Sequence, residues 1–359
     1  MNAFNLKPLS FFGDAKPRDV LRVLTYHPQQ FDASVVSIPT ASDPLMRSRT
    51  CTVLEKAIGD LDLLPLELIN KVLRRSDLRT VSTLRLLNRR ARAVVDSSFP
   101  YKLILLHAPQ VVAALEKTGV ASHFSVDDVF RALSTPSCGV CGKFGTYLWI
   151  PECTRCCYLC VREAPELMPM SERDARDTFG ITKSGLRGVP IMVTSPGLYT
   201  TQQRPYRRKR HFLSRERARQ AALDIHGGTV ASRLIAAQDP TTVAQGRSDR
   251  TKNDPTRFMT VVPLPYFDPT SRITHVGLSC QGCRFGFKRL RSQSSLPPPT
   301  PIDQRDQIYT MEDIFEYFKT CVDARELWRA YRKMCFPTGK YSNDDDDIPI
   351  HLRRYVENR

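Results

Sequence analysis

The chain has 359 residues, which exceeds the size at which one hydrophobic core usually keeps growing, so we expect two or three packed regions joined by looser segments. Its 41% apolar and 25% charged residues are typical of a globular protein, while 26 prolines indicate long non-helical stretches. The formal net charge of +16 favours acidic surfaces, whether nucleic acid, anionic membrane or protein, without choosing among them.

The sequence shows no sign of export or of a membrane span. Its first residues lack a basic segment followed by an apolar run and a cleavage site, and no run of about 18 apolar residues occurs. We therefore expect a cytoplasmic or nuclear protein without membrane association. Because thiols stay reduced in those compartments, the 11 cysteines are interpreted as metal ligands or core residues rather than as disulfides.

Shifts in composition and periodicity predict a mainly α fold with a small irregular α+β part and long loops. The predicted parts are a loosely ordered segment at 1–53, a helical domain at 54–105, helices with a cysteine-rich module at 106–200, a basic helix and flexible linker at 201–256, a C-terminal α+β part at 257–336 and a mobile acidic tail at 337–359.

The segment 54–105 carries leucine and valine at helical spacing. Pro65 can open a first helix because the first turn needs no amide donor, Asp77 can cap a second helix, and a third should end before Pro100. Four apolar residues share one face of the first helix: Leu68, Ile69, Val72 and Leu73. The three helices carry more apolar surface than they can hide, so another protein or the rest of the chain must cover it.

This segment resembles the F-box family. The shared pattern is a Leu-Pro start with an acid two residues on, apolar pairs in the first helix, Asp-Leu opening the second and a basic stretch opening the third. The matching residues are Leu64, Pro65, Glu67, Leu68, Ile69, Val72, Leu73, Asp77, Leu78, Leu84, Leu87 and Arg89. The resemblance implies a three-helix F-box at 61–105.

The resemblance further implies a non-catalytic subunit that recruits an unknown protein substrate to a Skp/cullin/F-box ubiquitin ligase. The segment would bind the Skp adaptor, and through it a cullin, by placing apolar helix side chains in a groove. The implied adaptor-binding residues are Leu64, Pro65, Leu68, Ile69, Val72, Leu73, Leu78 and Leu84. On periodicity alone, the alternative is a helical subdomain packed on its own chain.

Cap signals predict further helices downstream. A short helix is expected over 109–117, and Ser125 can cap a helix that covers 127–133. Ser171 followed by Asp174 resembles a capping box, opening a helix that should stop near Gly180. A final helical pair is expected over 310–335, with Thr310 as the cap that begins it.

The cysteines between 138 and 160 have the spacing of a zinc site. Cys138 and Cys141 form a knuckle with glycines that permit a tight turn, and 15 residues separate this pair from Cys157 and Cys160. Four thiolates favour structural zinc, with no open coordination position.

Two further pairs leave the ligand set open. Cys153 and Cys156 are an alternative second pair, or they form a second site with Cys280 and Cys283. The competing interpretation, in which small cysteines fill a core, suits Cys51, Cys321 and Cys335.

The basic run Arg207, Arg208, Lys209 and Arg210 lies in a segment, 202–225, that we expect to be largely helical. It can serve as a solvated helix face, a nuclear import signal, or a contact for RNA or an acidic partner. A strand is expected over 258–267, confined to a sheet edge by its prolines.

No P-loop, dinucleotide-binding glycine motif, nucleophile elbow or zinc-protease His pair occurs, so the sequence predicts no enzyme activity. The spacing also lacks the eight ligands of a RING-type ligase. The competing functional class is a zinc-stabilised nucleic-acid-binding or scaffold protein acting outside a ubiquitin ligase.

Overall fold

The computed structural model describes residue 12 and residues 15–26, 58–199, 205–236, 254–293 and 305–335. The chain forms two compact units, one built from both ends, 1–28 with 277–359, and the other from 29–276. The expected acidic tail at 337–359 lies outside the described residues, as do residues 237–253 of the expected basic helix and linker at 201–256.

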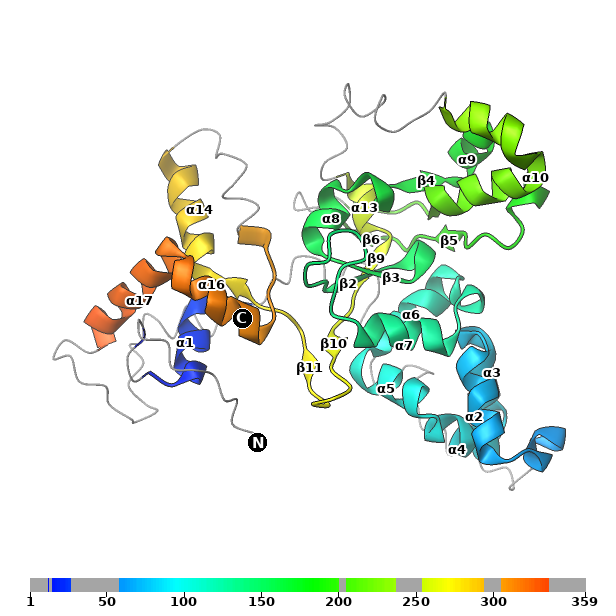
Figure 1. Cartoon of the computed structure of the whole chain (residues 1–359), viewed down its shortest axis with the longest axis horizontal. Helices are drawn as coiled ribbons and strands as arrows, with labels where there is room; N and C mark the ends of the chain where they lie inside the picture. The colour runs from blue at the N-terminus through cyan, green and yellow to red at the C-terminus, as the bar shows by residue number, and fades with distance from the viewer. Residues whose placement is uncertain are drawn as a thin grey trace. The chain divides into compact units, whose positions relative to one another are not determined.

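The leucine-rich segment folds into successive short helices, at the blue and cyan end of the larger unit (Figure 1). They are η2 Gly59–Leu63, α2 Leu66–Arg75, α3 Leu78–Leu87, α4 Arg89–Ser97 and α5 Phe99–His107. Asp77 caps α3 by accepting the amide of Thr80 at 2.9 Å, and Asn88 caps α4 by accepting the amide of Ala91 at 2.8 Å. The three predicted helices are therefore confirmed as α2, α3 and α4.

Helix α5 was not predicted. The third helix does end before Pro100, but this proline lies in the first turn of a new helix, where its missing amide costs no hydrogen bond. Tyr101 and Ile104 of α5 are fully buried, so the new helix completes the core of the leucine-rich segment.

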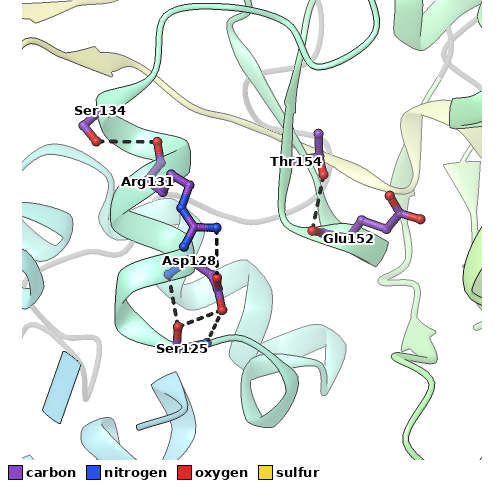
Figure 2. A network of polar contacts seen from close by, with 6 residues as sticks. All are labelled: Ser125, Asp128, Arg131, Ser134, Glu152 and Thr154. Carbon is purple, nitrogen blue, oxygen red and sulfur yellow. Dashed lines mark hydrogen bonds and ion pairs between the residues drawn. The ribbon is translucent and has the colours of Figure 1, made fainter. Parts of the chain in front are cut away.

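Helices α6 Pro109–Thr118 and α7 Val126–Ser134 follow, separated by η3 Ala121–His123. Ser125 caps α7 as predicted, and it does so in a full capping box (Figure 2). Ser125 Oγ accepts a hydrogen bond from the Asp128 amide at 3.1 Å, and the Asp128 carboxylate accepts one from the Ser125 amide at 3.0 Å. Helix α7 contacts α2 and α5 as well as β3 and β10, and so joins the leucine-rich helices to the sheets.

The first sheet of the larger unit is antiparallel with strand order β3-β2-β9. Its strands are β2 Tyr147–Trp149, β3 Thr154–Cys156 and β9 Val261–Pro263, and β9 is an edge strand as predicted. Neighbouring elements are η4 Ile150–Glu152, α8 Tyr158–Glu163, η5 Pro165–Leu167, α13 Pro255–Phe258 and the paired strands β10 Tyr266–Phe267 and β11 Thr274–His275. The expected strand over 258–267 is thus divided between β9 and β10.

Arg155 ties three segments of this unit together. Its guanidinium is buried and donates hydrogen bonds to five backbone carbonyls. These belong to Ala132, Leu133, Gly145, Leu264 and Pro265. Burial lowers the pKa of Arg155 to about 9, so the group stays charged at neutral pH.

The second sheet has strand order β4-β8-β5, with strands β4 Pro169–Ser171, β5 Met192–Val193 and β8 His211–Ser214. The remaining elements of this unit are α9 Glu172–Phe179, η6 Ser184–Leu186, β6 Gly197–Leu198, β7 Pro205–Tyr206 and α10 Arg215–Ala236. Ser171 caps α9, which ends at the left-handed Gly180 as predicted. The expected helix over 202–225 is wrong for residues 205–214, because these include β7 and β8 and Phe212 to Ser214 enter the sheet as buried residues.

The smaller unit brings both chain ends together. Its elements are α1 Pro17–Leu24, β1 Thr25–Tyr26, β12 Ser279–Cys280, α14 Gln281–Gln293, α16 Met311–Thr320 and α17 Val322–Cys335. Thr310 caps α16, the first helix of the predicted helical pair. The expectation of loose order throughout 1–53 is corrected for 15–26, because Val20 and Leu24 are buried and β1 pairs with β12. Within the described residues, no helix has the length and apolarity to cross a bilayer.

Candidate functional site

The leucine-rich helices leave many apolar side chains uncovered. Of the thirteen large apolar side chains that are exposed among the described residues, seven lie between residues 63 and 87. They are Leu63, Leu64, Leu66, Leu68, Val72, Leu86 and Leu87, with exposed fractions from 39% to 83%. We call these seven residues the leucine face. Pro65 is exposed beside them.

The first helix divides its apolar residues between two directions. Leu68 and Val72 are 43% and 49% exposed, whereas Ile69 and Leu73 are 4% and 3% exposed. Both pairs are spaced by four residues, so each forms its own stripe on the helix. The expectation that all four residues share one binding face is therefore corrected.

Two residues of α3 also differ from the expected adaptor-binding set. Leu78 is fully buried and Leu84 is half-buried. Ile69, Leu73 and Leu78 belong to the core of the unit, so they support the leucine face from behind rather than form it. Sequence reasoning omitted four residues of the leucine face from the set, and their apolar character within a short helical segment was the available signal. They are Leu63, Leu66, Leu86 and Leu87.

Four of the predicted metal ligands meet in space. The sulfur atoms of Cys138, Cys141, Cys157 and Cys160 all lie within 4.8 Å of one another, and Cys141 Sγ lies 3.6 Å from Cys157 Sγ. Tetrahedral zinc with Zn–S bonds of about 2.3 Å requires sulfur atoms about 3.8 Å apart. This four-cysteine cluster can therefore hold a metal ion.

The local fold explains why these thiols converge. The knuckle turns at Gly142, which has a positive φ of 74°, and closes with a hydrogen bond from the Gly142 amide to the Cys138 carbonyl at 2.9 Å. The β2–β3 hairpin then returns the chain to Cys157, which caps α8. The amide of Cys160 points at Cys157 Sγ, at 3.5 Å.

The four thiols lie so close together that they shift one another's pKa values. Cys138 accepts hydrogen bonds from the thiols of Cys157 and Cys160, which lower the pKa of Cys138. The two donors respond in the opposite direction: the pKa of Cys160 is raised, and that of Cys157 is raised to about 12. Four thiolates at these distances repel one another unless a cation neutralises them. The donor set thus fits a divalent, thiolate-binding metal.

The alternative ligands Cys153 and Cys156 belong to neither metal-competent cluster of the described residues. Both are buried, and Cys156 Sγ points to the carbonyl of Tyr147 at 3.7 Å. Burial raises the pKa of both thiols, so they behave as neutral core residues.

Cys280 and Cys283 form a second cluster with Cys321, and the three sulfur atoms lie within 4.8 Å of one another. The proposed partnership of the first two with Cys153 and Cys156 is therefore replaced by a different set. Cys321 is a buried core residue, as expected, and its sulfur also lies beside those of Cys280 and Cys283. The side chains of Cys51 and Cys335 lie outside the described residues.

The comparison with protein families identifies the helices that carry the leucine face. The F-box domain model matches residues 61–103, which run from η2 into α5. The chain contains an F-box domain. No curated protein and no solved structure matches the chain, so the rest of it carries no assignment by similarity.

F-box domains typically bind the Skp adaptor within ligase complexes that contain a cullin, and the proteins that carry them are generally non-catalytic adaptors. In this F-box domain, the end of η2, the exposed residues of α2 and the end of α3 hold the leucine face, while Ile69 and Leu73 of α2 are buried inside the unit. The match also places the start of α5 within the domain.

The basic run lies outside the F-box domain, in the turn between β7 and β8. Arg207, Arg208, Lys209 and Arg210 are all exposed there. The next residue, His211, lies 3.4 Å from a carboxylate oxygen of Glu172. The four cations are thus presented by a turn rather than by a helix.

Proposed function

We propose that this chain is the substrate-recruiting subunit of a Skp/cullin/F-box ubiquitin ligase. In this proposal the leucine face binds the Skp adaptor, the residues outside the F-box domain bind a protein target, and ubiquitin transfer is carried out by partner proteins. The single observation that supports it best is the leucine face itself, which lies within the residues matched by the F-box family.

The physical case rests on apolar area left in water. Covering one large apolar side chain is worth about 1.5–3 kcal/mol. The seven side chains of the leucine face are exposed in the larger unit, so a partner surface that covers them would gain this free energy. A groove on the adaptor that accepts α2 and the end of α3 fits this requirement. Leu64, Pro65, Leu68 and Val72 are the proposed anchors, with the half-buried Leu84 at the margin.

The test is co-purification of the full chain with the Skp adaptor. Replacing both Leu64 and Leu68 by Ala should weaken adaptor binding by about 2–4 kcal/mol, or roughly 30- to 1,000-fold, without unfolding the chain. The matched control is Ile225→Ala, since Ile225 is an equally large, half-exposed side chain on α10. Equal adaptor recovery from the double variant and the control would refute the proposal.

We further propose that the four-cysteine cluster binds zinc as a structural ion that fixes the knuckle against the β2–β3 hairpin and α8. Its ligands are Cys138, Cys141, Cys157 and Cys160, which supply four thiolates and leave no position for a substrate. Elemental analysis should find zinc in the purified chain and less of it in Cys138→Ser. Folded, metal-free protein would contradict this assignment.

A second candidate function, nucleic-acid binding, rests on the exposed run from Arg207 to Arg210. Four cations in one turn can contact phosphates without base specificity. Binding to RNA or DNA that falls steeply with salt, combined with no association with the Skp adaptor, would favour this function over the ligase role. Unchanged nucleic-acid binding after replacing all four cations would exclude it.

A further inference from the structure

We propose that the cysteines Cys280, Cys283 and Cys321 form a second metal site, which takes a divalent, thiolate-binding ion of the zinc class. The site belongs to the smaller unit, which is assembled from both ends of the chain. It is separate from the four-cysteine cluster and from the F-box domain, so it goes beyond the proposed function.

Two sulfur–sulfur distances in this cluster match those expected around a tetrahedral metal ion. Cys321 Sγ lies 3.9 Å from Cys280 Sγ and 3.5 Å from Cys283 Sγ. Zinc with bonds of about 2.3 Å requires sulfur separations of about 3.8 Å. All three cysteines are buried, although 41 residues separate Cys280 from Cys321. Sulfur atoms this close together, from segments far apart in the chain, fit a single metal ion that all three bind.

The backbone around the sulfurs favours thiolates. Cys280 directly precedes α14, a helix of 13 residues, and Cys283 lies in its first turn. Cys321 caps α17, a helix of 14 residues. Cys321 Sγ accepts the amide of Ala324 at 3.5 Å. The starts of both helices therefore present partial positive charge to the same group of sulfur atoms.

Two glycines allow this convergence. A Cβ atom at Gly282 would overlap the backbone of Asp323 and Ala324, and one at Gly286 would overlap the Asp323 carboxylate. Helix α14 therefore packs against the start of α17 more closely than larger residues permit. This close approach brings the Cys280–Cys283 pair up to Cys321.

The neighbouring tyrosine supports the charge of the cluster. Tyr317 Oη lies 3.0 Å from Cys283 Sγ, so it can donate a hydrogen bond to a thiolate there. Its ring stacks on Tyr309 with ring centroids 4.7 Å apart, which holds the hydroxyl in place. We assign Tyr317 as a positioning residue and the three thiolates as the protein ligands.

The ion would stabilise the unit built from the two chain ends. Cys280 lies in β12, which pairs with β1 through Thr25 and Tyr26, so fixing Cys280 also fixes the strand that follows α1. The core around the site includes Val20, Leu24 and Trp328. A metal at this site thus links α1 to α14 and α17 without a disulfide.

The test is the zinc content of the full chain after removal of loosely bound metal, measured by native mass spectrometry. The wild type should hold two zinc ions, and Cys321→Ser and Cys138→Ser should each hold one. Cys156→Ser is the matched control, since Cys156 is buried and lies in neither cluster, and it should keep two. Tyr317→Phe should also keep two while releasing one of them faster to a chelator.

A wild type that holds one zinc, lost on Cys138→Ser, would overturn the second site, as would a disulfide among the three cysteines. Two zinc ions retained in Cys321→Ser would overturn it as well. If Cys321→Ser fails to fold, cobalt titration of metal-free Cys138→Ser decides. Because this variant lacks a ligand of the four-cysteine cluster, thiolate-to-cobalt absorption should rise until one equivalent is bound at the remaining site, and the absence of such absorption would refute the proposal. Adaptor binding is measured separately, so failure of the F-box proposal remains distinguishable.

Discussion

The buried side chain of Arg155 makes five hydrogen bonds within the larger unit. A buried guanidinium normally has a carboxylate partner, but the partners of Arg155 are five backbone carbonyls from α7, the segment before β2 and the segment after β9. Because these carbonyls come from distant parts of the chain, each would be left without its donor if the side chain were removed. Arg155 therefore holds the cysteine-rich module and the helices next to the F-box domain in one unit.

Replacing Arg155 by Lys should lower the free energy of unfolding by about 3–5 kcal/mol, because an ammonium group cannot reach all five carbonyls. Denaturant unfolding of the full chain measures the change. The matched control is Arg131→Lys on α7, where the side chain is largely exposed and the expected change is within about 0.5 kcal/mol. Equal stability of the two variants would contradict the role assigned to Arg155.

The two stripes of α2 predict opposite responses to truncation. Leu73→Ala should lower the free energy of unfolding by about 2–5 kcal/mol, because Leu73 is buried. Leu68→Ala should cost less than about 1 kcal/mol, because Leu68 is exposed, and should instead weaken adaptor binding. Thermal melts and adaptor binding of both variants make the comparison. A large stability loss in Leu68→Ala would show that the exposed stripe is packed within the chain.

At the scale of helices and strands, local signals in the sequence were informative. Asp77, Ser125, Ser171 and Thr310 each cap the helix that they were expected to open. Pro100 marked the end of the third helix correctly but did not reveal α5, because a proline that ends one helix can equally begin the next. The basic segment was misleading because charge density does not distinguish a turn from a helix face, whereas the buried residues of β8 do.

The capping box of α7 provides a test at this scale (Figure 2). Ser125→Ala removes the acceptor for the Asp128 amide and should lower the free energy of unfolding by about 1 kcal/mol. Ser125→Asp is the matched control, since Asp is also a strong capping residue and should restore most of the loss. Denaturant midpoints measure both variants. A neutral Ser125→Ala would contradict the cap.

The contact between α5 and the β10–β11 hairpin predicts a pH dependence. His107 stacks on Phe267 with ring centroids 4.7 Å apart, and its Nδ1 lies 2.8 Å from Thr274 Oγ1. Burial lowers the pKa of His107 below its ordinary 6.5, so the folded chain binds fewer protons than the unfolded chain around that pH.

The stability that neutral His107 provides is therefore present above pH 6.5 and is lost as the pH falls below that value towards the lower folded pKa. Unfolding measured between pH 7.5 and about 5 should show a steeper loss for the wild type than for His107→Gln, which does not titrate. Identical slopes for the two proteins would contradict this prediction.

For the whole molecule, the sequence predicted the mainly helical class, the F-box segment and the four cysteines that meet near residues 138–160. These features depend on residues close together in the chain. The three-cysteine cluster could not be found in this way, because Cys321 has no nearby Cys-x-x-Cys partner and reaches Cys280 only through the packing of α14 on α17. The pairing of β1 with β12, from opposite ends of the chain, likewise leaves no local signal.

Backbone hydrogen exchange of the full chain, with and without the purified Skp adaptor, tests the central claim most directly. The account predicts slower exchange on adaptor binding over residues 63–72 and 84–88, which hold the leucine face, and unchanged exchange in the β2–β3 hairpin. Adaptor binding that leaves residues 63–72 unchanged, or no binding at all, would contradict it.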